Sequence, residues 1–229
     1  MPTLLTRRHV LTAGGQLACA TALSSALGAS VTLLRPTTAR AATAAQLGAL
    51  QPADANGLRL PEGFQSRVIA RSLLPVPTDS ADAPNYTWHM YPDGAATFAQ
   101  PDGGWIYVSN SETAAELGGG VSAIRFTADG QTLSAYRILS NTRLNCSGGR
   151  TPWGTWLSCE EIAFGKVFEC DPTGAAPAVK RSALGAFKHE AVTVDPVYHH
   201  LYLTEDEPDG RLYRFVPDSY PDLSRGSLQ

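Results

Sequence analysis

Three residues that could bind a metal ion stand at the start of short apolar runs in this chain. Asp93, Cys146 and Glu190 each open a run with the composition of a β-strand. Carboxylates are typical ligands of hard cations such as calcium, whereas a thiolate favours a transition metal such as iron or zinc. If the three runs lie side by side, their first residues predict a site of mixed oxygen and sulfur ligands.

A second set of acidic residues ends three similar runs at residues 107–112, 156–161 and 202–207. Each run reads aromatic, aliphatic, hydroxyl, polar, any residue, acid, and the runs recur at intervals of 49 and 46 residues, in the range of propeller blades. An acid in a hairpin turn is most often only solvated, but recurrence at one place in three repeats favours ligands. The acids of these turns are Glu112, Glu160, Glu161, Glu205, Asp206 and Glu207.

The chain has the pattern of an all-β protein. It has 229 residues, of which 43% are hydrophobic and 17% charged, with glycine- and proline-rich turns between short runs and no helical period. A four-stranded repeat cannot bury both faces alone, so neighbouring repeats must stack around an axis. We expect residues 60–229 to form about three blades of a β-propeller that is incomplete at its C-terminus. A β-sandwich with chance similarity between hairpins is the alternative.

The first 41 residues predict an export signal. They contain the pair Arg7-Arg8, a mildly apolar stretch to Leu34 and an Ala39-Arg40-Ala41 cleavage pattern. We therefore expect a twin-arginine signal peptide at residues 1–41, a linker at residues 42–59, and a periplasmic or secreted protein without a stable membrane anchor. The formal net charge is -3, and all four arginines of the first 41 residues are lost on cleavage, so nucleic-acid binding is not expected.

Three cysteines remain after residue 41, and an odd number in an oxidising compartment leaves one thiol unpaired. Cys146 stands close to a glycine pair, which favours a ligand role. Cys159 is interpreted as a core thiol or as a partner of Cys170 across its own hairpin. His189, next to Glu190, could hydrogen-bond a substrate oxygen, bind a metal or be a satisfied polar residue.

The sequence resembles a known family in several segments. Residues 145–161 (NCSGGRTPWGTWLSCEE) closely resemble the signature of the PhoX-type alkaline phosphatases, and residues 187–192 and 202–206 are similar to further motifs of that family. The resemblance implies a secreted, monomeric phosphomonoesterase on a six-bladed β-propeller, with iron and calcium ions at the mouth of the channel. By motif, Cys146 resembles the iron-binding cysteine. The carboxylates that resemble those near the metals are Glu112, Glu161, Glu190 and Glu205.

Two departures from the family qualify this expectation. Ser111 stands between Asn110 and Glu112, where the family often has a histidine. The family also continues for several blades beyond residue 229, so we expect a chain that is inactive alone or that needs a second chain to complete the ring. We expect Cys146, Glu190 and His189 to be the catalytic residues, with Asp93 and Asp206 as further metal ligands. Alternative functions are a calcium-dependent propeller hydrolase of the lactonase type and a non-enzymatic periplasmic binding propeller with structural calcium.

Overall fold

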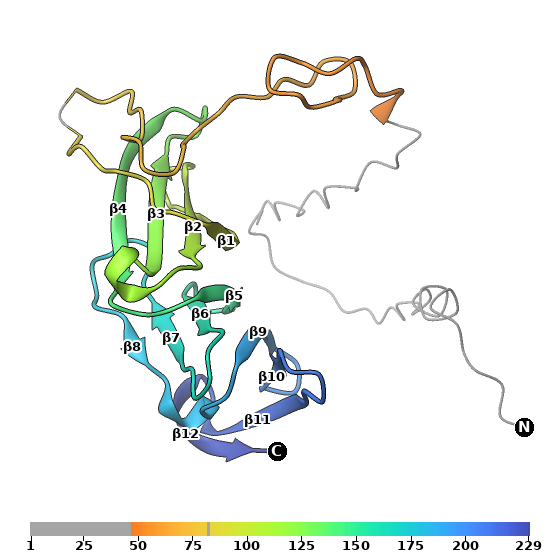
Figure 1. The fold of residues 1–229 in the computed structure, drawn as a ribbon, viewed down its shortest axis with the longest axis vertical. Coiled ribbons are helices and arrows are strands. Elements are labelled where there is room, and N and C mark those ends of the chain that lie inside the picture. The colour runs from red at the N-terminus through yellow and green to blue at the C-terminus, as the bar shows by residue number, and fades with distance from the viewer. Residues whose placement is uncertain (1–46, 82) are drawn as a thin grey trace, which may run out of the picture. The chain divides into compact units, whose positions relative to one another are not determined.

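A computed structural model describes residues 47–81 and 83–229 of the chain (Figure 1). The chain divides into two units, Met1–Ala49 and Leu50–Gln229, and the second contains all of the sheets. The predicted signal peptide at residues 1–41 lies outside the described residues, as does the first part of the predicted linker. In the described part of the chain, no helix is long and apolar enough to cross a membrane.

Residues 92–228 form three four-stranded antiparallel sheets, each built in chain order (Figure 1). The first sheet contains β1 (Pro92–Ala99), β2 (Trp105–Ser111), β3 (Gly120–Phe126) and β4 (Thr132–Ser140). The second sheet contains β5 (Asn145–Arg150), β6 (Trp156–Glu160), β7 (Val167–Cys170) and β8 (Val179–Lys180). The third sheet contains β9 (His189–Asp195), β10 (His200–Glu205), β11 (Leu212–Ser219) and β12 (Asp222–Leu228). Two short 3-10 helices lie between strands, η2 (Ala115–Leu117) after β2 and η3 (Ser182–Leu184) after β8. The expected all-β fold is confirmed.

The first strands of the three sheets lie next to one another, β1 against β5 and β5 against β9. Two glycines permit this close approach. A Cβ atom on Gly94 would lie 2.6 Å from the Cα atom of Ser147, and one on Gly149 would lie 1.9 Å from the carbonyl oxygen of Val192. Gly94 therefore admits β5 and Gly149 admits β9, which brings the starts of the three first strands together.

Apolar layers fill the space between successive sheets. Between the first and second sheets, Ile106, Val108 and Val121 pack with Trp156 and Cys170. Between the second and third sheets, buried side chains from both sheets form a further layer of the same kind. Its members include Leu157, Cys159, Val167, Val192, Leu201, Leu203 and Phe215.

Asn110 joins the first two sheets through polar contacts inside this core. Its amide nitrogen donates to the carbonyl oxygens of Cys146 and Ser147, at 3.0 and 2.8 Å. Its side-chain oxygen accepts from the Trp156 indole and the Ser158 hydroxyl, each at 2.9 Å. Asn110 is fully buried and uses both halves of its amide, so it fixes β5 against β2.

The strand register shows which positions of the three repeats are equivalent. The backbone N–H groups of Glu112, Glu161 and Asp206 donate to the carbonyl oxygens of Tyr91, Leu144 and Lys188, respectively. Because the three acidic residues are equivalent, so are the residues five positions before them, and Leu201 is the equivalent of Tyr107 and Trp156. The sequence pattern instead aligned Tyr202 with those two residues, and this alignment is wrong by one residue. The physical reason is that Leu201 faces the second sheet, as a buried residue must, whereas Tyr202 points to the other face of the strand.

The two cysteines of the second sheet cannot pair. Cys159 lies opposite Val167 and Cys170 lies opposite Trp156, and the two thiols belong to different apolar layers on opposite faces of the sheet. All three described cysteines are free. Of the two interpretations of Cys159, the disulfide with Cys170 is therefore excluded, and the core thiol is confirmed.

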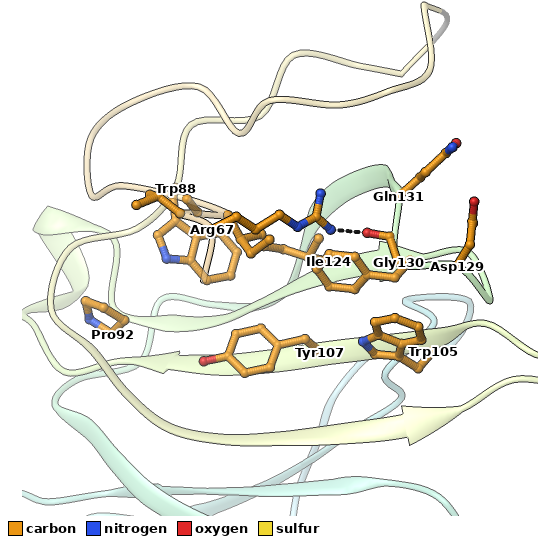
Figure 2. A pocket seen from close by; sticks show the side chains of 13 residues that line it. Arg67, Trp88, Pro92, Trp105, Tyr107, Ile124, Asp129, Gly130 and Gln131 are labelled. Atoms are coloured by element: carbon orange, nitrogen blue, oxygen red, sulfur yellow. Dashed lines mark hydrogen bonds between the residues drawn. The ribbon is translucent and has the colours of Figure 1, made fainter. Parts of the chain in front are cut away.

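The other face of the first sheet is only partly covered. Residues 67–70 and Trp88 lie over it and leave a cavity of about 750 Å³, lined by Trp105, Tyr107 and Ile124 among others (Figure 2). Figure 2 shows Arg67 reaching across this cavity to the carbonyl oxygen of Gly130. The equivalent faces of the second and third sheets are covered by the preceding sheet instead.

We expect Asn110→Ala to lower the free energy of unfolding by about 2–4 kcal/mol, because it leaves the Trp156 and Ser158 donors and two carbonyl oxygens without their partner. Urea unfolding followed by tryptophan fluorescence measures this loss. The exposed substitution Gln131→Ala is the control, with an expected change of less than about 0.5 kcal/mol. Equal stability of the two variants would contradict the role assigned to Asn110.

Candidate metal centre

Each sheet contributes two ligand-type side chains at equivalent positions. Asp93, Cys146 and Glu190 are the second residues of β1, β5 and β9. Glu112, Glu161 and Asp206 directly follow β2, β6 and β10 and make the equivalent backbone bonds described above. The first strands touch, so these positions converge at one edge of the three sheets.

Two groups of three could each hold a metal ion, and they share Cys146. The first consists of Asp93, Glu112 and Cys146, and the second of Cys146, Glu161 and Glu190. Within each group the ligand atoms lie within 4.8 Å of one another. The Sγ atom of Cys146 is 3.5 Å from Asp93 Oδ2 and 3.4 Å from both carboxylate oxygens of Glu190. A single thiol thus stands among carboxylates from all three sheets.

The five residues of these two groups, here called the cluster, carry the charge pattern of a cation site. Burial raises the pKa of Glu112, and the neighbouring carboxylate of Asp93 raises it further. Burial also raises the pKa of Glu190, and both burial and hydrogen bonds to Glu161 and Glu190 raise the pKa of the Cys146 thiol. These groups are hard to ionise together unless a positive charge lies between them, and a thiolate with carboxylates is a donor set that suits a metal ion.

Lys188 brings a positive charge to one side of the cluster. Its Nζ atom lies 3.0 Å from Glu161 Oε1 and 2.7 Å from Asp206 Oδ2. The hydrogen bond from Lys188 lowers the pKa of Asp206, and the two carboxylates raise that of Lys188. Asp206 therefore stands at the edge of the cluster, paired with an ammonium group, and it is in neither of the two groups of three. Lys188 lies within residues 187–192, which resemble a family motif, but the sequence pattern indicated no role for it. The signal that could have identified it is its position directly before the run that begins at His189, two residues before Glu190.

The structure does not bring Glu205 into either group of three. Its carboxylate accepts from the backbone N–H of Arg211 at 3.2 Å and from the hydroxyl of Tyr213 at 3.1 Å. Glu160 holds the matching place in the second sheet, where it accepts from the backbone N–H groups of Arg143 and Lys166. Both residues thus close hairpins, and Asp206 is the structural equivalent of Glu112 and Glu161.

His189 is buried beside the apolar layer between the second and third sheets and is in neither of the two groups of three. Its side chain is fully buried, its ring centroid is 3.7 Å from that of Phe187, and burial lowers its pKa to about 4. Neither ring nitrogen has a hydrogen-bond partner among the described residues. The register of β9 against β10 shifts between the pairs formed by Leu203 and Glu205, so a bulge interrupts the regular alternation of side chains at His189 and Glu190. Glu190 lies 3.4 Å from the Cys146 thiol, whereas His189 packs on Phe187 of the apolar layer between the second and third sheets.

We expect Glu112→Gln to stabilise the metal-free protein at about pH 8. The folded-state pKa of Glu112 is raised, so this residue's contribution to stability is lost as the pH rises through that pKa, and the amide removes the loss. The gain should be below about 1 kcal/mol because solvent screens a half-exposed group, and it should vanish near pH 4. Thermal melting in chelator at the two pH values measures it, with the exposed Glu62→Gln as control. A variant less stable than the parent at about pH 8 would refute the repulsion.

Comparison with known proteins places this chain in a family. The family model described as Alkaline phosphatase PhoX matches residues 111–166 and 163–227, together more than half of the chain. No curated protein and no solved structure matches the chain. The matched residues contain Asp206 and the part of the cluster that follows β2, namely Glu112, Cys146, Glu161 and Glu190, and the chain belongs to the alkaline phosphatase PhoX family.

Proposed function

We propose that this protein is a metal-dependent alkaline phosphatase that releases phosphate from phosphomonoesters. Membership of the PhoX family supports the hydrolase activity. The observation that carries the metal dependence is Cys146, whose thiol belongs to both candidate metal groups and lies among carboxylates from all three sheets.

The proposed cofactors are iron and calcium ions. The thiolate of Cys146 would bind iron, and the carboxylates of Asp93, Glu112, Glu161 and Glu190 would bind both kinds of ion. When bound, such ions neutralise the charge of a phosphate group and stabilise the charge that develops during its transfer. The chain's own carboxylates fix where the ions lie, and therefore where a phosphoester must bind. His189 is buried, so its role in this proposal is to support β9 and the position of Glu190.

We also propose that the three sheets are consecutive blades of a β-propeller. The equivalent register of the sheets and the contacts between their first strands support this arrangement. Val121 and Val167 are fully buried under the next sheet, whereas their equivalent in the third sheet, Leu212, is 69% exposed. This leaves the outer face of the third sheet for a further sheet, which we assign to a second copy of the chain, whereas Val76 and Trp88 pack on the outer face of the first sheet. Residues 60–229 would form the propeller part, after a linker at residues 42–59.

The proposed location is the periplasm or the extracellular space. The support for it is the Arg7-Arg8 pair and the cleavage pattern at residues 39–41 of the sequence. A twin-arginine signal exports a folded protein, which is compatible with a metal cluster assembled from three sheets before export.

Replacing Cys146 tests the phosphatase proposal. We expect Cys146→Ala to lose bound iron and to reduce p-nitrophenyl phosphate turnover by about 100-fold or more, since it removes the ligand common to both groups. Elemental analysis and the turnover assay, each with added calcium, measure the two effects. Cys159→Ala, a core thiol outside the cluster, is the matched control and should keep both iron and activity.

Two results would contradict this proposal. Full hydrolysis by Cys146→Ala with calcium alone would favour a calcium-dependent hydrolase of the lactonase type. Calcium-dependent melting of the parent protein without turnover of any phosphoester would favour a binding propeller.

Light scattering, which measures the mass of the protein in solution, tests whether two copies of the chain associate. We expect the parent protein to have the mass of two chains, and Leu212→Lys to have the mass of one, because a buried lysine at the new interface is strongly unfavourable. Val179→Lys, at an exposed apolar residue of the outer strand β8, should leave the mass unchanged. A parent protein with the mass of a single chain at all concentrations would overturn this assignment.

A further inference from the structure

We infer that Lys188 serves as the cation of the metal-free cluster. Its ammonium group holds Glu161 and Asp206 together without metal, and it competes with an incoming metal ion for Glu161. Its Nζ atom bridges a carboxylate of the second sheet and one of the third, at 3.0 and 2.7 Å. Among the ion pairs of the described residues, those that reach the cluster come from Lys188. This inference rests on the proposed metal site and adds a residue that regulates it.

The fold does not require a charged residue at this position. Tyr91 and Leu144 hold the equivalent positions in the first two sheets and accept the same backbone hydrogen bond. That bond uses only the carbonyl oxygen, so the side chain is free to vary. The ammonium group at position 188 is therefore explained by the acidic side chains beside it and not by the backbone.

The equivalent carboxylates of the three sheets, Glu112, Glu161 and Asp206, differ in their neighbours. Glu112 is grouped with ligands from its own sheet and the next one, and Glu161 is grouped in the same way with Cys146 and Glu190. Asp206 is third in the series and lies beside Glu190 in the same sheet, but it belongs to no such group in the described residues. Lys188 occupies the position beside Asp206 that a cation would otherwise take.

Glu161 is the point of competition. It is a member of the group with Cys146 and Glu190, and it also accepts the ion pair from Lys188. A divalent cation in this group would repel the ammonium group across a few ångströms. Lys188 must then release Glu161 or weaken the binding of the ion, and Asp206 remains to hold the displaced ammonium group.

Calcium titration of the chelator-treated full chain by calorimetry tests this competition. We expect Lys188→Met to bind calcium about tenfold more tightly than the parent, because an ammonium group no longer competes for Glu161. Lys188→Arg keeps the charge and should retain the calcium affinity of the parent. Lys180→Met, at an exposed lysine of β8, should bind calcium as the parent does.

Thermal melting without calcium provides a readout that is independent of metal. Lys188→Met leaves Glu161 and Asp206 facing each other, so its melting temperature should fall, and the added substitution Asp206→Asn should restore it. Equal calcium binding by Lys188→Met and the parent would overturn the inference about Lys188 and leave the proposed metal site standing. Absence of calcium binding in both proteins would overturn the metal site and the competition together. Binding by Lys188→Met alone would support the competition.

Discussion

One backbone hydrogen bond, repeated three times, places the whole cluster. The N–H groups of Glu112, Glu161 and Asp206 donate to the residue before the first strand of their own sheet. Each bond continues the strand pairing by one residue and sets an acidic side chain beside the second residue of the first strand. Because the bond involves no side chain, those second residues differ between sheets, and one of them is a cysteine in place of an acid. A cluster of mixed ligands is thus built on a uniform backbone.

The cluster lowers the stability of the fold, and contacts in the surrounding structure compensate for this loss. Burial and mutual repulsion raise the pKa values of Glu112 and Glu190, so the ionised cluster favours separation of the sheets. Asn110 opposes this separation with four hydrogen bonds between the first two sheets. Gly94 and Gly149 let the first strands approach as closely as backbones can. Functional sites commonly retain destabilising groups that the rest of the protein compensates.

Sequence patterns predicted the strands and the three ligand-type side chains that open them, and they were less successful with side-chain direction. Asp93, Cys146 and Glu190 were chosen because each opens an apolar run, and the register puts all three at the same position. The third repeat was misaligned because Leu201 replaces the aromatic residue of the other two repeats, so Tyr202 matched the pattern instead. A one-residue shift exchanges the two faces of a strand, and it also aligned Glu207, in place of Asp206, with Glu112 and Glu161. Residue types alone carry no information about which face a neighbouring sheet covers.

Among the three described sheets, the second has a neighbouring sheet on each side, and this explains the central place of Cys146. Its second residue can meet ligands from the preceding sheet and from the following one, whereas Asp93 and Glu190 each meet a neighbour on one side. A thiol at that position is shared between two candidate sites, so its protonation affects both. Losing that proton costs free energy because the thiol is buried among carboxylates, and a metal ion is the partner that would offset this cost. The order of the sheets therefore determines which ligand couples the two sites.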